Sequence, residues 1–401
     1  MSDILRSPFR LLLSLLLVLD ASAREPIPAP IKTVRARDLG VPFDGTTGKF
    51  NAITDVPGVE VGYTTLISGE GKLEVGKGPV RTGVTAILPR GRDAMNDPVF
   101  AGYFSLNGNG EMTGTAWVEE SGFLEGPIVL TNTHSVGVAR DAVIAWRLAH
   151  GGPDAEGFAW SLPVVAETWD GWLNDVDGFH VKPEHVAHAI ESAHSGMIEE
   201  GSVGGGTGMI CYEFKGGTGT ASRMVPVAAI AGRGSSETKQ FAVGVLVQAN
   251  CGRRPQLTIR GLEVGKKIPG SVYKQETGSI IIVVATDAPL LPHQLKRLAR
   301  RASLGLARTG SVSGNGSGDL FIAFSAANPH AADAKPPIRT IETMPNDLMD
   351  PLFTATVEAT EEAIINALVD NHDMIGRDNH KVEALPRERL QQLLKEYNRS
   401  R

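Results

Sequence analysis

The stretch that decides the fold reads Gly278-Ser279-Ile280-Ile281-Ile282-Val283-Val284-Ala285-Thr286-Asp287-Ala288-Pro289. Its six consecutive apolar residues, five of them β-branched, predict a strand that is buried on both faces. Asp287 is a favourable N-cap and Pro289 suits a first helical turn, so we expect a helix directly after this strand. Ser279 therefore lies at the entrance of an interior strand, where its hydroxyl is both accessible and firmly held.

Other apolar runs repeat this pattern along the chain. Strands are expected at 127–130, 163–166, 241–250 and 319–325, and helices at 138–149, 183–193, 349–369 and 385–397. Strands that are apolar throughout need cover on both faces, and here they alternate with helices. The alternation predicts a layered α/β sandwich in one mature domain. The charged, turn-rich segment 252–274 is expected to be a surface linker.

Composition indicates a globular protein and argues against a nucleic-acid-binding one. The 401 residues are 42% hydrophobic and 21% charged, as in an ordinary globular protein. The net charge is −6 and no block of basic residues occurs, which argues against a nucleic-acid-binding surface.

The first 23 residues have the pattern of a signal peptide. Arg6 and Arg10 precede an apolar run at 11–19, and Ala21-Ser22-Ala23 is an A-x-A cleavage site. The run is too short for a stable membrane-spanning helix, although a short retained anchor is the alternative. The sequence thus predicts a mature protein that begins near Arg24, is periplasmic or secreted, and has no membrane span once the signal is removed.

Ser279 has the features of a nucleophile that the chain itself liberates. Such catalysis needs a hydroxyl at a strand start, an attackable peptide bond before it, and donors for the oxyanion. Gly278 provides the bond, because a residue without Cβ tolerates a strained carbonyl and lets the hydroxyl approach. After cleavage the freed α-amine, with a pKa of about 7.7–8.0, can act as the base for its own hydroxyl.

Two asparagines at strand ends are candidates for the same site. Asn250 ends the strand at 241–250, where its amide N–H can point at a developing oxyanion. Asn132 follows the strand at 127–130 and can line the pocket. The alternative for either residue is an asparagine that caps an ordinary turn.

Further candidates lie at the ends of other strands. Ser317 and Asp319 flank Gly318, and the two-residue period of a strand places both on one face, where they can support Ser279 or simply cap a loop. Glu167 can bind a substrate ammonium by a charge-assisted hydrogen bond. Trp169 can wall the pocket, although tryptophans are more often core residues.

Metal and phosphate chemistry are disfavoured. His185, His188 and His194 lack the spacing of a zincin pair, and the glycine-rich stretch 204–208 lacks the lysine of a P-loop. Only two cysteines occur, Cys211 and Cys251, and sequence does not show whether they meet.

Several of these stretches together resemble the DmpA-type L-aminopeptidase/D-amidase-esterase family, which includes the β-peptidyl aminopeptidases. The stretches that carry the resemblance are Leu130-Thr-Asn-Thr-His-Ser-Val-Gly137, Val165-Ala-Glu-Thr-Trp-Asp-Gly171, Gly204-Gly-Gly-Thr-Gly-Met209, Leu246-Val-Gln-Ala-Asn250, Gly278-Ser-Ile-Ile-Ile-Val-Val-Ala-Thr-Asp-Ala-Pro-Leu290 and Gly316-Ser-Gly-Asp319. The resemblance covers nearly all of the mature chain, and the motifs are specific only in combination.

The resemblance implies a four-layer αββα sandwich like that of the N-terminal nucleophile hydrolases. It implies self-cleavage into an α chain, 24–278, and a β chain, 279–401, which together form one domain and assemble as a homotetramer without a cofactor. The implied substrates are small peptides, amino-acid amides and esters, including those with D- or β-amino acids.

The resemblance also assigns roles to individual residues. Ser279 matches the nucleophile, Asn250 the oxyanion donor, Ser317 and Asp319 the supporting pair, and Glu167 the acidic position near the substrate amine.

Two positions bear on substrate range. The family that this chain resembles has a tyrosine where Trp169 stands, and an indole offers only an N–H donor. The residue before Ser279 is glycine, as in the amidase-like members, whereas some β-peptidases have asparagine there. This glycine is a weak indication of α-aminopeptidase and D-amidase activity.

Three other interpretations remain open from sequence. The same nucleophile would serve an acyltransferase of the ornithine acetyltransferase type, although a signal peptide argues against that cytoplasmic metabolism. Cleavage before Cys251 would make that thiol the nucleophile instead. A non-catalytic exported binding protein is the third possibility, suggested by the missing tyrosine.

Overall fold

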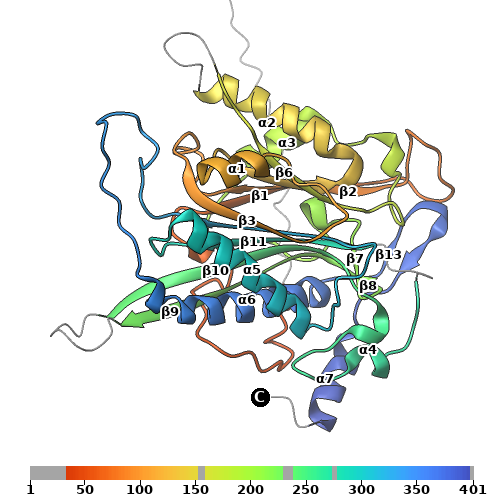
Figure 1. The fold of residues 1–401 in the computed structure, drawn as a ribbon. Coiled ribbons are helices and arrows are strands. Elements are labelled where there is room, and N and C mark those ends of the chain that lie inside the picture. The colour runs from red at the N-terminus through yellow and green to blue at the C-terminus, as the bar shows by residue number, and fades with distance from the viewer. Residues whose placement is uncertain (1–32, 152–158, 229–237, 273–277, 398–401) are drawn as a thin grey trace, which may run out of the picture. The chain divides into compact units, whose positions relative to one another are not determined.

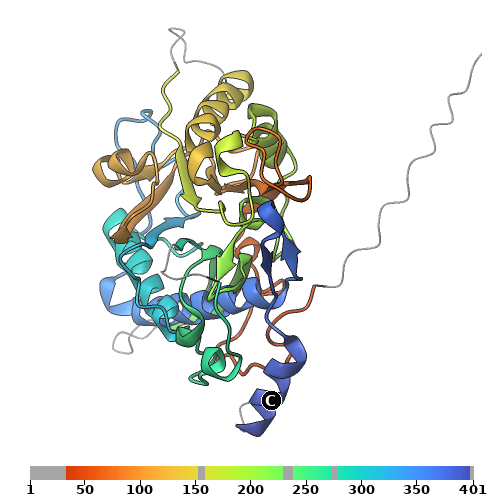
Figure 2. The same cartoon turned by 90° about the vertical axis from the view of Figure 1, so that its right-hand side faces the viewer.

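Two stacked sheets form the centre of the protein, and helices cover both outer faces (Figures 1 and 2). The structure is a computed structural model that describes residues 33–397 apart from 152–158, 229–237 and 273–277. The expected signal segment, 1–23, lies outside the described residues. Thr33–Arg401 form one compact unit.

The larger sheet has six strands in the order β4-β3-β12-β11-β10-β9, and the smaller has four in the order β1-β2-β5-β6. The strands are β1 (Glu60–Ser68), β2 (Val80–Leu88), β3 (Val99–Gly108), β4 (Phe123–Leu124), β5 (Ile128–Asn132), β6 (Val164–Thr168), β9 (Gly217–Ala228), β10 (Thr238–Asn250), β11 (Ser279–Thr286) and β12 (Gly318–Ser325). Two small hairpins pair β7 (Ile210–Cys211) with β8 (Phe214–Lys215) and β13 (Met374–Ile375) with β14 (Lys381–Val382).

The described helices are α1 (Thr115–Ser121), α2 (Val136–Gly151), α3 (Pro183–Glu191), α4 (Val264–Lys267), α5 (Pro292–Arg308), α6 (Asp350–Val369) and α7 (Arg387–Glu396). Figure 1 shows α2 and α3 over the smaller sheet and α5 and α6 under the larger one. This arrangement confirms the predicted four-layer αββα sandwich. None of the helices in the described ranges is long and apolar enough to cross a membrane.

The central strand β11 alternates between two cores. Ile280, Ile282 and Val284 pack toward α5 and α6, whereas Ile281, Val283 and Ala285 pack into the layer between the sheets. All eight residues of the strand are buried. Ser279 has the same parity as Ile281, so the strand directs its side chain toward the layer between the sheets.

The helix after β11 begins later than predicted. It starts at Pro292, with Leu291 as its N-cap, and not near Asp287 and Pro289. The Asp287 carboxylate instead accepts the N–H of Ala242 on the neighbouring strand, at 2.7 Å. The Asp287 side chain, which the local pattern predicted to cap a helix, therefore binds the main chain of a neighbouring strand.

The segment 252–274 is not the surface linker that we expected. Its described part, 252–272, contains α4, and the side chains of Leu257, Ile259 and Val264 are fully buried in the core that also includes residues of β10 and α6. Leu262 is buried as well, so four apolar side chains between residues 257 and 264 anchor the segment in the core. The high charge of the segment concealed that pattern.

Candidate active site

Asn250 and Ser279 face each other across neighbouring strands. They are direct partners in the antiparallel register of β10 and β11. Directly opposed residues on such strands have their side chains on the same face, with Cβ atoms about 4.5–5.5 Å apart. Both side chains are almost fully buried, with 3% and 5% of their surfaces exposed. The structure thus brings together the two residues that sequence placed at the ends of separate strands.

Hydrogen bonds fix the orientation of the Asn250 carboxamide. Its Oδ1 accepts the N–H of Ile210 at 2.7 Å, and its Nδ2 donates to the carbonyl oxygen of Trp169 at 2.9 Å. These two contacts determine which end of the amide is the donor. Because an asparagine Nδ2 carries two hydrogens, the group has a second N–H to offer.

The hydroxyl of Ser279 is held by the main chain of the next strand. Gly318 pairs with Ser279 in the parallel register of β11 and β12, and its N–H donates to Ser279 Oγ at 3.1 Å. A Cβ on Gly318 would lie 2.3 Å from the carbonyl oxygen of Asn109. Glycine is required there because the loop after β3 passes directly against β12.

Ser317, just before β12, and Asp319, in β12, have their side chains in contact, as the strand period predicted. Ser317 Oγ donates to Asp319 Oδ1 at 2.6 Å, and the hydroxyl of Ser313 donates to Oδ2. The carboxylate also accepts the N–H of Ile280. Among the described residues, the contacts from this pair thus reach Ser279 through the main chain of Gly318 and Ile280. Burial raises the pKa of Asp319, and these three donors oppose the rise.

Glu167 approaches the same region from the smaller sheet. Its carboxylate accepts the N–H of Glu111 at 3.0 Å and the hydroxyl of Thr133. A Cβ on Gly110 would lie 3.2 Å from Glu167 Oε1 and 3.2 Å from the Cα of Gly318. Gly110 therefore bridges the acidic residue and the strand that holds the Ser279 hydroxyl. Burial raises the pKa of Glu167, and the Thr133 and Glu111 donors oppose this.

Asn132 belongs to a buried polar cluster around Asp170. Asn132 donates to Thr82 Oγ1 at 2.8 Å, and Asp170 accepts the side-chain amide of Asn174 at 3.0 Å. Burial raises the pKa of Asp170 to about 6, against hydrogen bonds from Thr82, Asn174 and Asn132. The amide nitrogen of Asn132 is thus engaged in this cluster, whereas its buried Oδ1 has no hydrogen-bond partner among the described residues.

Trp169 contributes to the site mainly through its backbone carbonyl, which orients Asn250. Its half-buried indole lies over Gly171, where a Cβ would be 2.7 Å from the ring.

Gly278 is needed for space. A Cβ at this residue would lie 2.1 Å from the carbonyl oxygen of Asn250. We expected this glycine to tolerate a strained carbonyl and to let the hydroxyl approach. The structure adds that two backbones pass close to each other at the point where the strand begins.

Sequence reasoning missed Thr133, Gly110 and Asp170. Thr133 and Asp170 lie inside motifs that we quoted for the resemblance, so motif membership was the available signal. The contacts of Thr133 and Asp170 form between neighbouring strands of the smaller sheet, and only the contacts of Gly110 depend on how the two sheets stack. Local sequence patterns reveal neither arrangement. In the described part of the chain no group of three or more histidine, cysteine or carboxylate side chains is placed to bind a metal ion.

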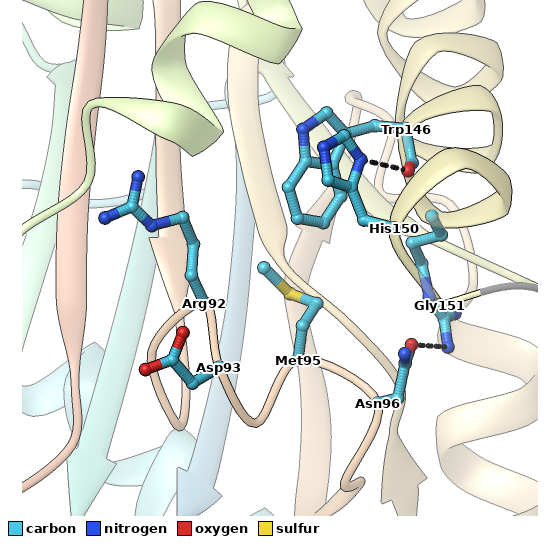
Figure 3. A pocket seen from close by; sticks show the side chains of 8 residues that line it. Arg92, Asp93, Met95, Asn96, Trp146, His150 and Gly151 are labelled. Atoms are coloured by element: carbon cyan, nitrogen blue, oxygen red, sulfur yellow. Dashed lines mark hydrogen bonds between the residues drawn. The ribbon is translucent and has the colours of Figure 1, made fainter.

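A separate pocket of about 400 Å³ lies at the far end of α2 (Figure 3). Trp146 and His150 stack there with ring centroids 4.1 Å apart, and His150 Nδ1 lies 2.9 Å from the Trp146 carbonyl oxygen. Since α2 has 16 residues, this end is about 20 Å from the end near Asn132. The pocket contains none of the candidate residues.

Comparison with known proteins places this arrangement in context. Residues 51–382 match peptidase family S58. The beta-peptidyl aminopeptidase BapA of Sphingosinicella microcystinivorans is 53% identical over 382 residues, which cover 91% of this chain and 93% of that protein.

Two solved structures have similar folds. The L-aminopeptidase D-Ala-esterase/amidase of Ochrobactrum anthropi, described as a prototype for the serine aminopeptidases with a variant of the Ntn hydrolase fold, is 47% identical with a TM-score of 0.84. The alignment covers 92% of this chain and 99% of that one. A Burkholderia sp. beta-aminopeptidase is 47% identical with a TM-score of 0.80, over 90% and 99% of the two chains. The predicted relation to the N-terminal nucleophile hydrolases is confirmed.

Proposed function

Because the chain belongs to peptidase family S58, we propose that it is a self-processing serine aminopeptidase that releases N-terminal residues from short peptides and amides. The observation that carries the proposal is that Asn250 and Ser279 oppose each other on neighbouring strands. Trp169 orients the Asn250 amide, and the Gly318 N–H holds the Ser279 hydroxyl. The family match favours this activity over an acyltransferase or a binding protein.

In the first step the chain cuts itself. Ser279 Oγ attacks the carbonyl carbon of Gly278, the C–N bond to Ser279 breaks, and the nitrogen takes up the proton. Water then hydrolyses the resulting ester, which frees Oγ and leaves Ser279 as a new N-terminus. The N–H of Asn250 Nδ2 stabilises the oxyanion of the tetrahedral intermediate.

The same atoms then act on substrates. Ser279 Oγ attacks the carbonyl of the substrate's first residue while the free α-amine of Ser279 accepts its proton. That proton passes to the leaving amine, and the acyl-enzyme ester forms. Water, deprotonated by the same amine, releases the N-terminal residue as a free acid.

For the preferred substrate we propose peptides and amides with an N-terminal β-amino acid. The relative named as a beta-peptidyl aminopeptidase is 53% identical, against 47% for the structure named as an L-aminopeptidase D-Ala-esterase/amidase. Gly278 remains an indication in the opposite direction, so D-alanine amide is the competing substrate.

Glu167 is proposed to bind the substrate ammonium. It reaches the site through Gly110, and its two donors leave lone pairs on a buried carboxylate. An ammonium needs the ionised carboxylate, and burial raises the pKa of this group. As the pH falls through that raised pKa, Glu167 takes up a proton and the site loses its charge.

Glu167→Gln is therefore expected to raise KM by about tenfold or more, as a lost charge-assisted hydrogen bond of roughly 1.5–3 kcal/mol implies. KM of the wild type should also rise as the pH falls, and KM of this variant should be much less sensitive to pH. Steady-state kinetics across the acid range would measure both. Glu111→Gln is the matched control, because it removes an exposed charge and retains the backbone N–H that binds Glu167. The Glu111 charge helps to raise the pKa of Glu167, so the acid limb of this control should persist and shift to lower pH. An unchanged acid limb in Glu167→Gln would contradict the assignment.

We further propose that residues 1–23 direct export to a periplasm or the medium, and that the α chain 24–278 and the β chain 279–401 assemble as a homotetramer. The apolar run at 11–19 and the A-x-A site support export. The homotetramer is supported only by the family resemblance.

Cleavage and substrate preference can be tested with one preparation. An intact mass spectrum under denaturing conditions should show two chains, the smaller beginning Ser-Ile-Ile-Ile. Hydrolysis of a β-homoalanine amide should then exceed that of D-alanine amide and L-alanine amide at equal concentration. An unbroken chain that hydrolyses all three would refute the mechanism, and a preference for D-alanine amide would refute only the substrate class. A fragment beginning Cys-Gly-Arg-Arg would identify Cys251 as the nucleophile.

A further inference from the structure

The two cysteines of the chain lie side by side in the interior. Cys211 ends β7 and Cys251 directly follows β10, 40 residues later. Their Sγ atoms are 3.5 Å apart, and both side chains are fully buried. Sequence left open whether they meet, and the structure places them in contact.

The main chains around the two thiols are already joined. The N–H of Tyr212, next to Cys211, donates to the carbonyl oxygen of Cys251 at 2.6 Å. A disulfide needs its sulfur atoms about 2.05 Å apart, so the two Sγ atoms must approach by roughly 1.5 Å. Side-chain rotation and small backbone shifts are sufficient for a movement of this size.

We propose that Cys211 and Cys251 are a disulfide site. The oxidant is a disulfide compound. One cysteine thiolate attacks a sulfur atom of the oxidant, forms a mixed disulfide and releases one thiol. The second cysteine thiolate attacks the protein sulfur of that mixed disulfide and releases a second thiol. The protein gives up two hydrogen atoms and two S–H bonds for one S–S bond, and the oxidant is reduced to two thiols.

The site adjoins the residues that hold Asn250. Ile210, next to Cys211, donates the N–H that orients Asn250 Oδ1, and Cys251 follows Asn250 in the chain. A Cβ on Gly278 would lie 2.8 Å from the Cα of Cys251, so the bond before Ser279 passes the same point. A disulfide here would link the residue after Ile210 to the residue after Asn250, and so join Asn250 covalently to the segment that orients its side chain. Any effect on turnover rests on the proposed function, whereas the effect on stability does not.

Oxidation should be measurable as a loss of thiols and a gain in melting temperature. The full-length protein is incubated with oxidised glutathione just below its melting temperature, where local opening admits the oxidant, or with dithiothreitol as the reduced reference. Both samples are denatured in N-ethylmaleimide and weighed intact. We expect two maleimide groups on the reduced protein and none on the oxidised one, with a melting temperature raised by roughly 5 °C.

Cys251→Ala is the matched variant. It cannot form the bond, so its melting temperature should not respond to the oxidant. Two maleimide groups on the oxidised wild type, a stable glutathione adduct or a disulfide-linked dimer would each overturn the proposal. Both cysteines precede Gly278, so the thiol count is the same in cut and uncut chains. A failure here is therefore distinct from a failure of self-cleavage.

Discussion

Ser279→Ala is expected to remain one uncut polypeptide and to lose at least about 10⁴-fold in kcat/KM. The alanine has no oxygen to attack Gly278, so no new N-terminus appears, and no acyl-enzyme can form on a substrate. Denaturing gels and intact mass would report the cut, and release of the amine product would report turnover. The fold should persist, because the Ser279 side chain accepts one hydrogen bond from the described residues, and the main chain that pairs in the sheet is unchanged by the substitution.

Ser279→Cys tests whether a different nucleophilic atom at this position can still cut the chain. A thiol is an intrinsically good nucleophile, so this variant should still cut itself, although more slowly. A Ser279→Ala protein that is nevertheless cleaved before residue 279 would show that another group attacks Gly278. An uncut Ser279→Ala protein with wild-type turnover would eliminate Ser279 as the nucleophile.

Asn250→Ala is expected to lower kcat by about 10²–10³-fold, which corresponds to roughly 3 kcal/mol of lost oxyanion stabilisation. KM should change little, because the interaction forms mainly in the transition state. Self-cleavage should slow as well, since its tetrahedral intermediate forms at the same place. Single-turnover assays and a time course of cutting after synthesis would measure the two effects.

Asn250→Asp serves as a shape-matched comparison. The carboxylate can still accept the N–H of Ile210, but it has no donor for the oxyanion and repels the carbonyl oxygen of Trp169. It should be at least as impaired as Asn250→Ala. A kcat within tenfold of the wild type in both variants would assign the oxyanion to a different donor.

Much of the site was predictable because strand ends carry polar residues. Ser279, Asn250 and Asp319 each stand at the boundary of an apolar run, where a rigid scaffold holds a polar side chain, and all three are buried in the structure. What local patterns did not reveal is register. Asn250 opposes Ser279 only because β10 and β11 pair antiparallel without a slip, and Gly318 reaches the hydroxyl only because β12 is parallel to β11.

The errors in prediction have a common cause. Asp287 looked like a helix cap and 252–274 looked like a linker because only local chemistry was considered. In the folded chain Asp287 binds Ala242, and Leu257 and Ile259 enter the core. Contacts with distant parts of the chain, and not local chemistry, decide where these residues lie. The contact between Glu167 and Gly110 likewise depends on how the two sheets stack, which a short stretch of sequence does not show.

The strand order of the larger sheet also limits when cutting can occur. Strands β11 and β12 lie between β10 on one side and β3 on the other, each border spanning eight residue pairs. If the chain is cut before Ser279, the two inner strands belong to the short piece and both flanking strands to the long one. The pieces would then be interleaved without a covalent link, and parting them would expose two sheet edges at once. Such a molecule has to be synthesised as one precursor, because pieces made separately would have to find each other while neither had a complete core.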